Sequence, residues 1–347
     1  MTHEHASNAN DTDELLHAAR RGDAAAFARL TAPLRPGLHA HCYRLLGSLA
    51  DAEDALQEAL LSAWRGLAGF EGKSSLRTWL FTIATHASLR VASRRPRRVV
   101  SSELSLPADP SAPHGPALDE PWLEPYPDAA FAAFAGESAP DARYDALESV
   151  ELAFVAALQH LPATQRAALI LRDVLGFSAE QTASALETSV ASVTSALQRA
   201  RTALERHGPA LSQQKNRREL GDETHRLLVE RFVEAWRRAD VDAVVALLAD
   251  DATFTMPPLP TWYSGREAIR GFMLEKVFRN RWRFSLGRVS GQPTVVAYLW
   301  NESAGAFRLS VLNLLTLRGE RIAAISAFLD EALLARFGLP ATWPAES

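Results

Sequence analysis

An acidic, proline-rich stretch between residues 99 and 151 is the feature that most limits how this chain can fold. It includes SSELSLPADPSAPHGPALDEPWLEPYPD, and residues 99–151 carry 11 acidic side chains against one basic side chain, a net charge of −10. Proline removes a backbone donor and fixes φ, so such a stretch is typical of connecting chain. At 347 residues the chain is also longer than one hydrophobic core usually serves. We therefore expect separate domains on either side of it.

The charge of the whole chain conceals a strongly basic block. The sequence holds 37 basic and 41 acidic residues, a net charge of −4. Residues 63–98 alone carry eight basic side chains and one acid, Glu71, a net charge of +7. The near-neutral total is thus a cancellation between this block and the acidic stretch, and it does not argue against nucleic-acid binding.

Cysteine usage and hydropathy indicate a cytoplasmic protein without membrane contact. A single cysteine, Cys42, cannot form an internal disulfide or a cysteine-rich zinc site. We expect it to be a small buried residue beside Tyr43 and Leu45. No apolar run approaches the roughly 20 residues needed to cross a bilayer, and MTHEHASNANDTDE lacks the features of a signal peptide. No metal or cofactor is expected.

The segment before the acidic stretch predicts amphipathic helices. Its alanines and leucines recur at spacings of three and four, and Ser48 or Asp51 can cap a helix through DAEDALQEALLSAWRGL. KSSLRTWLFTIATHASLRVASRRPRR then predicts a second helix that ends near Pro96. Its arginines, interleaved with Trp79, suit a surface that follows a phosphate backbone and stacks an unpaired base. The alternative is that Trp79 belongs to the core and the arginines form a solvated face.

Three motifs in this segment carry a family resemblance. GDAAAFARL, DAEDALQEALLSAWRGL and SSLRTWLFTIATHASL resemble, in order and spacing, the helical domain of bacterial extracytoplasmic-function sigma factors of the sigma-70 family. The resemblance implies that the DAED-type helix docks on the clamp of the RNA polymerase β′ subunit. It implies the polymerase contacts Asp51, Asp54, Gln57, Glu58 and Trp64. It also implies a surface that reads the opened −10 promoter element through Phe70, Lys73, Ser74, Ser75, Arg77, Thr78, Trp79, His86 and Arg90.

A second helical segment follows the acidic stretch. The pattern predicts helices over 150–159 and 163–175, a short helix capped by Ser178, and a last helix through ASVTSALQRARTALER. This is helix-turn-helix geometry, with a plain three-helix bundle as the alternative. The recognition helix is expected to present to DNA Ala191, Ser192, Thr194, Ser195, Gln198, Arg199 and Arg201.

The same segment also resembles a sigma domain. LPATQRAALILRDVLGFSAEQTASAL is similar to the domain that reads the −35 element as duplex, and the resemblance implies a contact with the polymerase β flap. Thr194 and Ala196 stand where that family commonly has basic side chains. The resemblance therefore implies weaker or differently specified −35 contacts.

From Asp222 onward the pattern changes to helices followed by β-rich runs, which predicts an α+β domain with a curved antiparallel sheet. LVERFVEAWRRADVDAVVALLADDATFTMPP, SGREAIRGF and ISAFLD resemble the SnoaL-like members of the nuclear transport factor 2 superfamily, a cone with a pocket. The histidine of this segment, His225, lies at the start of the domain and not on a strand that could line the pocket. Tyr263 and Asp330 therefore remain as candidates for acid/base catalysis. Its aromatic residues suit core packing, ligand binding or docking: Trp262, Tyr263, Trp282, Phe284, Trp300 and Phe307.

The expected fold is multidomain, with two all-α sigma domains, a helical bundle and a helix-turn-helix, followed by an α+β SnoaL-like cone. The predicted parts are residues 13–98, an acidic linker at 99–145, 146–207, a linker at 208–221, and 222–340. The motif WLEPYPD at 122–128 resembles one found in sigma factors with an additional C-terminal domain. We expect Trp122 and Tyr126 to have a docking role.

The sequence predicts an alternative sigma factor that binds core RNA polymerase and promoter DNA and is not an enzyme. The C-terminal domain is expected to modulate its activity, and an anti-sigma factor or a small-molecule ligand of that domain is a further partner that the resemblance allows. One alternative is a helix-turn-helix regulator that senses a ligand. Another is an isomerase or cyclase of the SnoaL type fused to a DNA-binding module.

Overall fold

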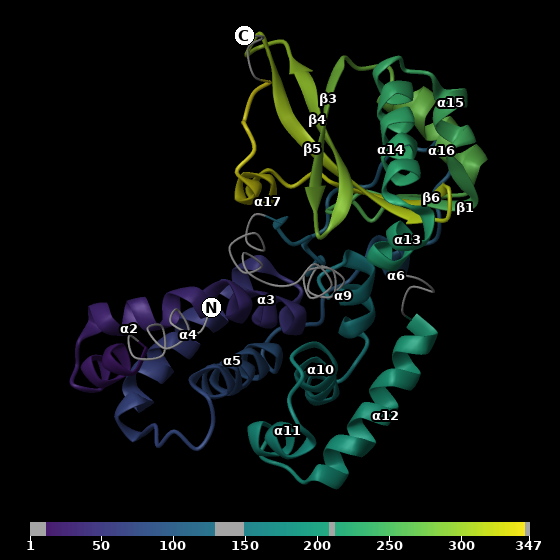
Figure 1. The fold of residues 1–347 in the computed structure, drawn as a ribbon. Helices are drawn as coiled ribbons and strands as arrows, with labels where there is room; N and C mark the ends of the chain where they lie inside the picture. The colour runs from purple at the N-terminus through teal and green to yellow at the C-terminus, as the bar shows by residue number, and fades with distance from the viewer. Residues whose placement is uncertain (1–11, 129–148, 208–211, 344–347) are drawn as a thin grey trace. The chain divides into compact units, whose positions relative to one another are not determined.

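The computed structural model describes residues 12–128, 149–207 and 212–343, and the chain divides into two compact units (Figure 1). Of the described residues, 12–97 and 157–207 belong to the first unit. The second unit holds residues 98–128, 149–156 and 212–343. Residues 129–145 of the expected acidic linker and residues 208–211 of the second linker lie outside the described part.

The first half of unit 1 is built from α-helices, several of which begin at a polar capping residue. The helices are α2 (Ala24–Thr31), α3 (Arg35–Leu46), α4 (Leu49–Gly66) and α5 (Leu76–Ala92). The Ser48 hydroxyl accepts a hydrogen bond from the Asp51 amide, so the predicted serine cap of α4 is confirmed. Ser75 caps α5 in the same way through the Thr78 amide.

Small residues allow these helices to approach closely. Ala52 and Ala55 of α4 are fully buried, as are Cys42 and Tyr43 of α3. The expected burial of Cys42 is confirmed, and this burial raises the pKa of its thiol to about 12. The thiol therefore stays protonated and unreactive at neutral pH.

The second half of unit 1 consists of α10 (Ala163–Leu169), a π-helical turn over Ile170–Val174, α11 (Ala179–Ala185) and α12 (Val190–His207). Before them, α9 (Leu152–Gln159) crosses the boundary between the two units. Ser178 and Gln181 form a capping box at the start of α11. The single helix predicted over 163–175 is thus an α-helix that ends in a π-helical turn.

Arg166 of α10 is buried and ties the loop before α10 to that helix. Its guanidinium donates to the Gln159 side-chain oxygen at 2.7 Å and to the Leu161 carbonyl at 3.1 Å. Burial lowers its pKa to about 10. Oxygen acceptors thus satisfy the two terminal nitrogens of the buried guanidinium, while its Nε has no hydrogen-bond partner among the described residues.

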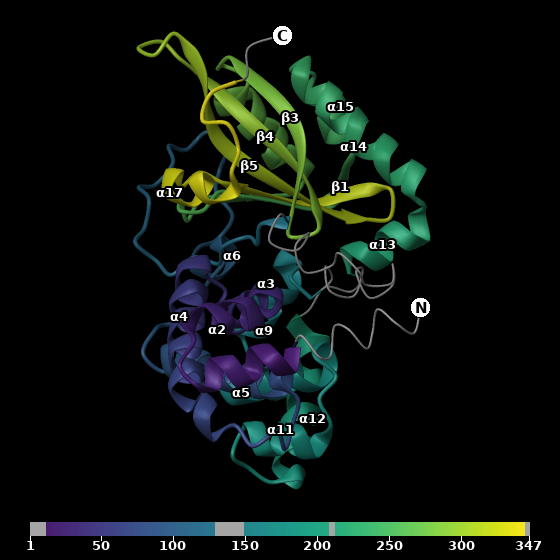
Figure 2. The same ribbon diagram turned by 60° about the vertical axis from the view of Figure 1, so that its left-hand side comes forward.

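Unit 2 is built on a six-stranded sheet of order β2-β1-β6-β5-β4-β3. Its strands are β1 (Leu248–Thr255), β2 (Trp262–Ser264), β3 (Trp282–Val289), β4 (Gln292–Asn301), β5 (Ala306–Arg318) and β6 (Arg321–Phe328). Its helices are α6 (Ser101–Leu104), α13 (Gln213–Leu220), α14 (Asp222–Arg237), α15 (Val241–Ala246), α16 (Arg266–Phe272) and α17 (Glu331–Leu334). Figures 1 and 2 show α14 and α15 together on one side of the sheet, where their apolar residues join its core.

The sheet contains one parallel pair, whereas the sequence predicts an antiparallel sheet. β1 and β6 run parallel, with Thr253 opposite Ala324 and Thr255 opposite Ser326. β6 follows β5 through a tight turn and must therefore run antiparallel to it. No short turn joins β1 to β6, so local sequence does not set the direction of that pair.

The described part of the acidic stretch packs on the C-terminal domain. The Ala108 amide donates to the Trp262 carbonyl at 2.8 Å, and the Leu118 amide donates to the Pro258 carbonyl at 3.0 Å. The side chain of Pro110 lies against Gly271, where a Cβ would come within 2.9 Å of it. Residues 99–128 are thus an extended arm on the domain, although their composition is that of a linker.

The WLEPYPD motif ends this arm with a buried anchor. Tyr126 is fully buried. Its amide donates to the Ser290 hydroxyl at 2.7 Å, and its carbonyl accepts from the Ser290 amide at 2.8 Å. Trp122 is half-buried and donates to the Leu118 carbonyl within the arm. Tyr126 therefore docks on the C-terminal domain as expected, while the indole N–H of Trp122 bonds inside the arm.

Candidate nucleic-acid and polymerase interfaces

The outer face of α4 combines acidic, amide and apolar side chains. Asp54, Gln57 and Glu58 recur at helical spacing and are exposed. Leu61 lies one turn further along the same face and is 52% exposed. An exposed leucine among polar side chains is typical of a protein-binding surface. We define the α4 face as Asp54, Gln57, Glu58 and Leu61.

The other two residues predicted on this surface lie differently. Asp51 is only 6% exposed and lies 3.8 Å from the Arg95 guanidinium. Trp64 is half-buried against Phe27, with ring centroids 5.2 Å apart. Sequence reasoning overlooked Leu61, although its position seven residues after Asp54 places it on the polar side of the helix.

The loop before α5 and the start of α5 bring several predicted −10 residues together. Lys73 and Ser75 are exposed, while Arg77, Thr78 and Trp79 are half-buried at the start of the helix. These five side chains, with the partly buried Ser74, form a polar surface around one tryptophan.

Phe70 and Trp79 form an aromatic pair beneath this polar surface. Phe70 is 8% exposed and packs on Trp79 with ring centroids 4.9 Å apart. The Arg20 guanidinium lies 5.7 Å from the Phe70 ring and donates to the Phe70 carbonyl. Phe70 is therefore placed to position Trp79, and little of its own surface is open to a ligand.

The remaining predicted −10 residues lie further along α5. His86 is half-buried and Arg90 is exposed. The Arg90 guanidinium lies 3.6 Å from the carboxylate of Glu58 on α4. Both side chains are about half exposed, so the pair adds little stability and can exchange partners.

The predicted recognition helix presents one face to solvent. Val193 and Leu197 are buried, and Ser189 caps the helix by accepting from the Ser192 amide at 3.2 Å. Exposed along the helix are all the residues predicted to face DNA: Ala191, Ser192, Thr194, Ser195, Gln198, Arg199 and Arg201. This is the arrangement that a helix entering a major groove requires.

Unit 2 contains an apolar cavity of about 170 Å³ among α14, α16 and the sheet. Its walls include Trp236 of α14, Phe254 of β1, Phe272 of α16 and Val311 of β5. His114, from the acidic arm, also lines it, and its Nε2 lies 3.0 Å from the Tyr263 hydroxyl. The arm therefore completes the wall of this cavity.

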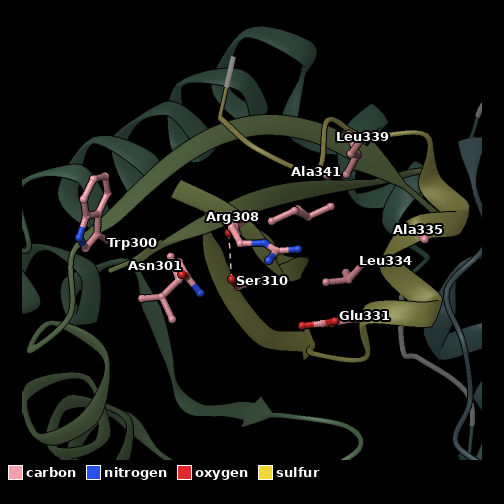
Figure 3. A pocket seen from close by; sticks show the side chains of 11 residues that line it. Trp300, Asn301, Arg308, Ser310, Glu331, Leu334, Ala335, Leu339 and Ala341 are labelled. Carbon is pink, nitrogen blue, oxygen red and sulfur yellow. Dashed lines mark hydrogen bonds between the residues drawn. The ribbon is translucent and has the colours of Figure 1, made fainter. Parts of the chain in front are cut away.

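A larger hollow of about 360 Å³ lies between the ends of β4 and β5 and helix α17. Figure 3 shows the polar side chains of Asn301, Arg308 and Glu331 around it. The Ser310 hydroxyl donates to the Arg308 carbonyl at 2.9 Å, a bond within the strand. This hollow has a mixed polar and apolar wall.

The residues considered for catalysis have structural partners. Tyr263 is buried beside His114, and burial raises its pKa to about 12. The Asp330 carboxylate caps α17 by accepting from the amides of Ala332 and Leu333. In the described ranges, no group of three or more histidine, cysteine or acidic side chains is placed to hold a metal ion. None of the helices within those ranges is long and apolar enough to span a bilayer.

Comparison with known families matches three consecutive parts of the chain. Sigma-70 region 2 matches residues 30–98, Sigma-70 region 4 matches 151–204, and the SnoaL-like domain matches 229–325. The sigma factor SigG of Mycobacterium tuberculosis is 40% identical over 330 residues, which cover 92% of this chain and 85% of SigG. SigJ of the same organism is 32% identical over 223 residues, covering 64% of this chain and 62% of SigJ.

A solved structure has the same fold. The crystal structure of SigJ from Mycobacterium tuberculosis matches with a TM-score of 0.57 at 23% identity, covering 90% of this chain and 99% of that one. Together with the match to SigG, these comparisons define the class: a sigma factor with a C-terminal SnoaL-like domain. The chain belongs to the extracytoplasmic-function sigma factors of the sigma-70 family. It is an alternative sigma factor that directs transcription initiation at promoters, and the predicted family and fold class are confirmed.

Proposed function

We propose that the α4 face binds the β′ clamp of core RNA polymerase, that the start of α5 reads the −10 element, and that α12 reads the −35 element. The observation that carries this proposal is the exposure pattern of α12. Every residue assigned to DNA there is exposed, while Val193 and Leu197 anchor the helix in the core. A bundle helix without a partner would not need so extended a face of small polar and basic side chains.

The polymerase contact rests on a mixed surface. Leu61 supplies an apolar centre, while Asp54, Gln57 and Glu58 supply a polar rim, which is the usual anatomy of a protein interface. Asp51 and Trp64 contribute to this site mainly by packing, because one is buried and the other is half-buried. The β flap is the polymerase element that we assign to the second sigma domain.

The −10 contact combines stacking with charge. Trp79 offers a partly exposed ring on which an unpaired base can stack. Lys73 and Arg77 supply positive charge at the start of the helix, and Arg90 supplies it about three turns further along α5. Ser74, Ser75, Thr78 and His86 provide the hydrogen-bonding groups. Phe70 contributes indirectly, because its ring packs against the Trp79 ring and positions it.

The −35 contact uses small side chains that let the helix enter the groove. Ala191, Ser192, Thr194 and Ser195 stand at its amino-terminal end, where a recognition helix approaches base edges. Gln198 is the longest uncharged hydrogen-bonding side chain among the assigned residues. Arg199 and Arg201 lie further along and suit phosphate contacts.

We assign the C-terminal domain a regulatory role without chemistry of its own, and we place the protein in the cytoplasm, where core polymerase and promoter DNA are found. The engagement of Asp330 as a helix cap and the high pKa of Tyr263 support a non-enzymatic domain. An anti-sigma factor is a further partner to be tested.

Run-off transcription with core polymerase tests this function. Full-length protein is expected to give promoter-specific transcripts and to co-purify with the core enzyme. A variant with Asp54→Lys and Glu58→Lys should lose promoter-specific transcription and co-purification. Glu267→Lys, a charge reversal at an exposed residue of α16, should keep both activities. A simple regulator would bind DNA without restoring initiation, and that result would overturn the proposal. Comparison with a chain ending near Gln213 measures whether the C-terminal domain inhibits or activates.

A further inference from the structure

Unit 1 contains a pocket of about 300 Å³ that the proposed polymerase and DNA contacts do not use. One wall comes from the end of α3, the start of α4 and the end of α5, and it includes Leu45 and Ala92. The other wall comes from the end of α9, the loop after it and α10, and it includes Gln159 and Arg166. The volume lies at the lower end of the roughly 300–1,000 Å³ of pockets that enclose small molecules. The pocket therefore lies between the two helical halves of unit 1 and has room for a small ligand.

The lining of this pocket is basic. Three arginines, Arg95, Arg97 and Arg166, contribute to it, and the acidic side chain among the lining residues is Asp51. The formal charges of these four side chains give a net charge of +2, to which His160 can only add. Arg95 is 63% exposed and lies 3.8 Å from the Asp51 carboxylate. A pair with so exposed a partner is weak, so Arg95 can exchange Asp51 for an anionic ligand.

Arg166 places a buried positive charge in the wall without a counter-ion. It is 5% exposed, and its terminal nitrogens donate to the Gln159 side-chain oxygen and to the carbonyls of Gln159, Leu161 and Leu45. All these acceptors are uncharged, and no acidic side chain pairs with Arg166 in the ranges that the structure describes. Burial lowers its pKa to about 10, so the guanidinium is charged at neutral pH. An anion in the pocket would supply the missing negative charge.

Two buried N–H groups of the lining residues also lack an acceptor. They are Nε of Arg166 and Nε2 of Gln159, neither of which has a hydrogen-bond partner in the described part of the chain. Gln159 is 3% exposed, and its side-chain oxygen already accepts from Arg166 at 2.7 Å. Unpaired buried donors are unfavourable. The oxygens of an oxyanion accept strongly from guanidinium and amide groups. The pocket thus offers unused donors as well as excess positive charge.

A phosphate group fits these features better than a carboxylate does. Arg95 and Arg97 belong to one wall and Arg166 to the other, so acceptor oxygens are needed in more than one direction. A phosphate monoester carries three acceptor oxygens and a charge of about −1.5 to −2 at pH 7. A carboxylate carries two acceptor oxygens and a single charge. Arginine is also the side chain best suited to bind phosphate through two parallel hydrogen bonds.

We propose that this pocket binds a small phosphate-bearing molecule, such as a sugar phosphate, and that the phosphate bridges the two helical halves of unit 1. Arg95 and Arg97 bind the phosphate from the first wall, and Arg166 supplies a fixed positive charge from the second wall. The ligand stabilises the packing of the two walls, because it binds only where they meet. The α4 face and the residues assigned to DNA on α12 do not line the pocket, so failure of this proposal would leave those contacts unaffected.

Calorimetric titration of the full-length protein tests the ligand class. The probes are ribose 5-phosphate, inorganic phosphate, acetate and ribose, at one ionic strength set with potassium chloride. Ribose 5-phosphate should bind at least as tightly as inorganic phosphate, because the pocket has room for the sugar. Acetate and ribose should bind about 10-fold more weakly or less, because they lack the second charge or any charge. Equal affinities for acetate and phosphate, or no binding of ribose 5-phosphate, would overturn the proposal.

Variants separate this pocket from general attraction to the basic block. Arg95→Gln and Arg97→Gln, at exposed positions, should each weaken binding of ribose 5-phosphate by about 3- to 10-fold. Asp51→Asn should strengthen it by a similar factor, because it removes the negative charge from the lining. Arg94→Gln is the matched control: Arg94 is exposed in the same segment but does not line the pocket, so affinity should change less than 2-fold. Equal losses in all three arginine variants would overturn the proposed site.

Hydrogen exchange tests the bridge between the two walls. The Arg95 amide donates to the Val91 carbonyl, and the Leu161 amide donates to the Leu158 carbonyl, each at 3.1 Å. With ribose 5-phosphate at 100 times its Kd, exchange at both amides should slow, by up to about 100-fold where opening requires release of the ligand. The Thr182 amide, which donates to the Ser178 carbonyl in α11, is the control and should exchange at an unchanged rate. Protection at Arg95 without protection at Leu161 would show that the phosphate does not bridge the walls.

Discussion

The Arg201 guanidinium on α12 donates two hydrogen bonds, of 2.8 and 3.1 Å, to the Asp173 carboxylate. Asp173 lies in the π-helical turn after α10, so the pair joins the recognition helix to its supporting helix. Both side chains are substantially exposed, at 57% and 35%. Exposed pairs of this kind contribute at most about 1 kcal/mol, so Arg201 can exchange Asp173 for a DNA phosphate.

Asp173→Asn should strengthen binding to duplex DNA that carries the −35 element, by about 3- to 10-fold at low salt. The change removes a negative charge beside the proposed interface and releases Arg201. Fluorescence anisotropy between 50 and 200 mM salt measures the effect, which should diminish as salt rises. Arg201→Gln is the opposing control and should weaken binding; equal affinities for the wild type and Asp173→Asn would contradict the proposed role of Arg201.

Leu61→Ser should weaken binding to core polymerase by about 10-fold or more without unfolding the protein. Leu61 is 52% exposed, so its loss costs the free protein little stability but removes the apolar centre of the α4 face. Titration of labelled sigma factor against core enzyme gives the Kd. Leu106→Ser, at an 87% exposed leucine of the acidic arm, is the control and should bind normally. Equal losses in both variants would argue against a specific α4 contact.

The folded state should lose stability below pH 6.5 because of His41. This side chain is fully buried, and burial, followed by the charges of Arg44 and Arg77, lowers its pKa to about 3. Its Nε2 lies 2.8 Å from the Thr85 hydroxyl, which itself donates to the Phe81 carbonyl, so Nε2 carries the proton. The unfolded chain takes up a proton near pH 6.5 while the folded chain stays neutral, so stability is lost as pH falls through this range.

The expected size of this effect is about 2 kcal/mol between pH 7.5 and pH 5, at 1.36 kcal/mol per pH unit below 6.5. Urea unfolding at a series of pH values measures it. His41→Gln should lower stability at neutral pH and flatten this dependence. A dependence that is the same in His41→Gln would assign it to other groups.

Tyr126→Ala should destabilise unit 2 by about 3–5 kcal/mol, because it empties a fully buried aromatic site. Trp122→Ala, at a half-buried side chain, should cost less. Denaturant unfolding gives the stabilities, and run-off transcription with the double variant tests the function of the anchor. Unchanged promoter output in the double variant would show that docking of the arm does not affect initiation.

Local features of the sequence were sufficient to locate most helices. Ser48 and Ser178 begin helices where a hydroxyl can accept an early amide, and this depends on residues within one turn. The exposed face of α12 also follows from helical spacing, since Val193 and Leu197 define the buried side. The family motifs lie within these same local segments, which is why the sigma-factor class could be predicted.

Other features depended on contacts between distant residues. Asp51 looks like a surface acid by its place in an acidic run, but Arg95, 44 residues later, packs beside it. The parallel pairing of β1 with β6 and the docking of Tyr126 on Ser290 likewise join segments far apart in the chain. No local pattern reports such pairings, because they are determined by the packing of the completed core.

By itself the sequence determined the order of the three domains, the helix caps and the class of the protein, because these depend on short-range hydrogen bonding and on the spacing of apolar residues. Only the tertiary structure decided that the proline-rich acidic segment is an anchored arm and that His114 completes the wall of a cavity. The physical reason is that proline and acidic side chains discourage helices and strands. They leave the backbone amides of Ala108 and Leu118 available to bond to carbonyl groups of another part of the chain.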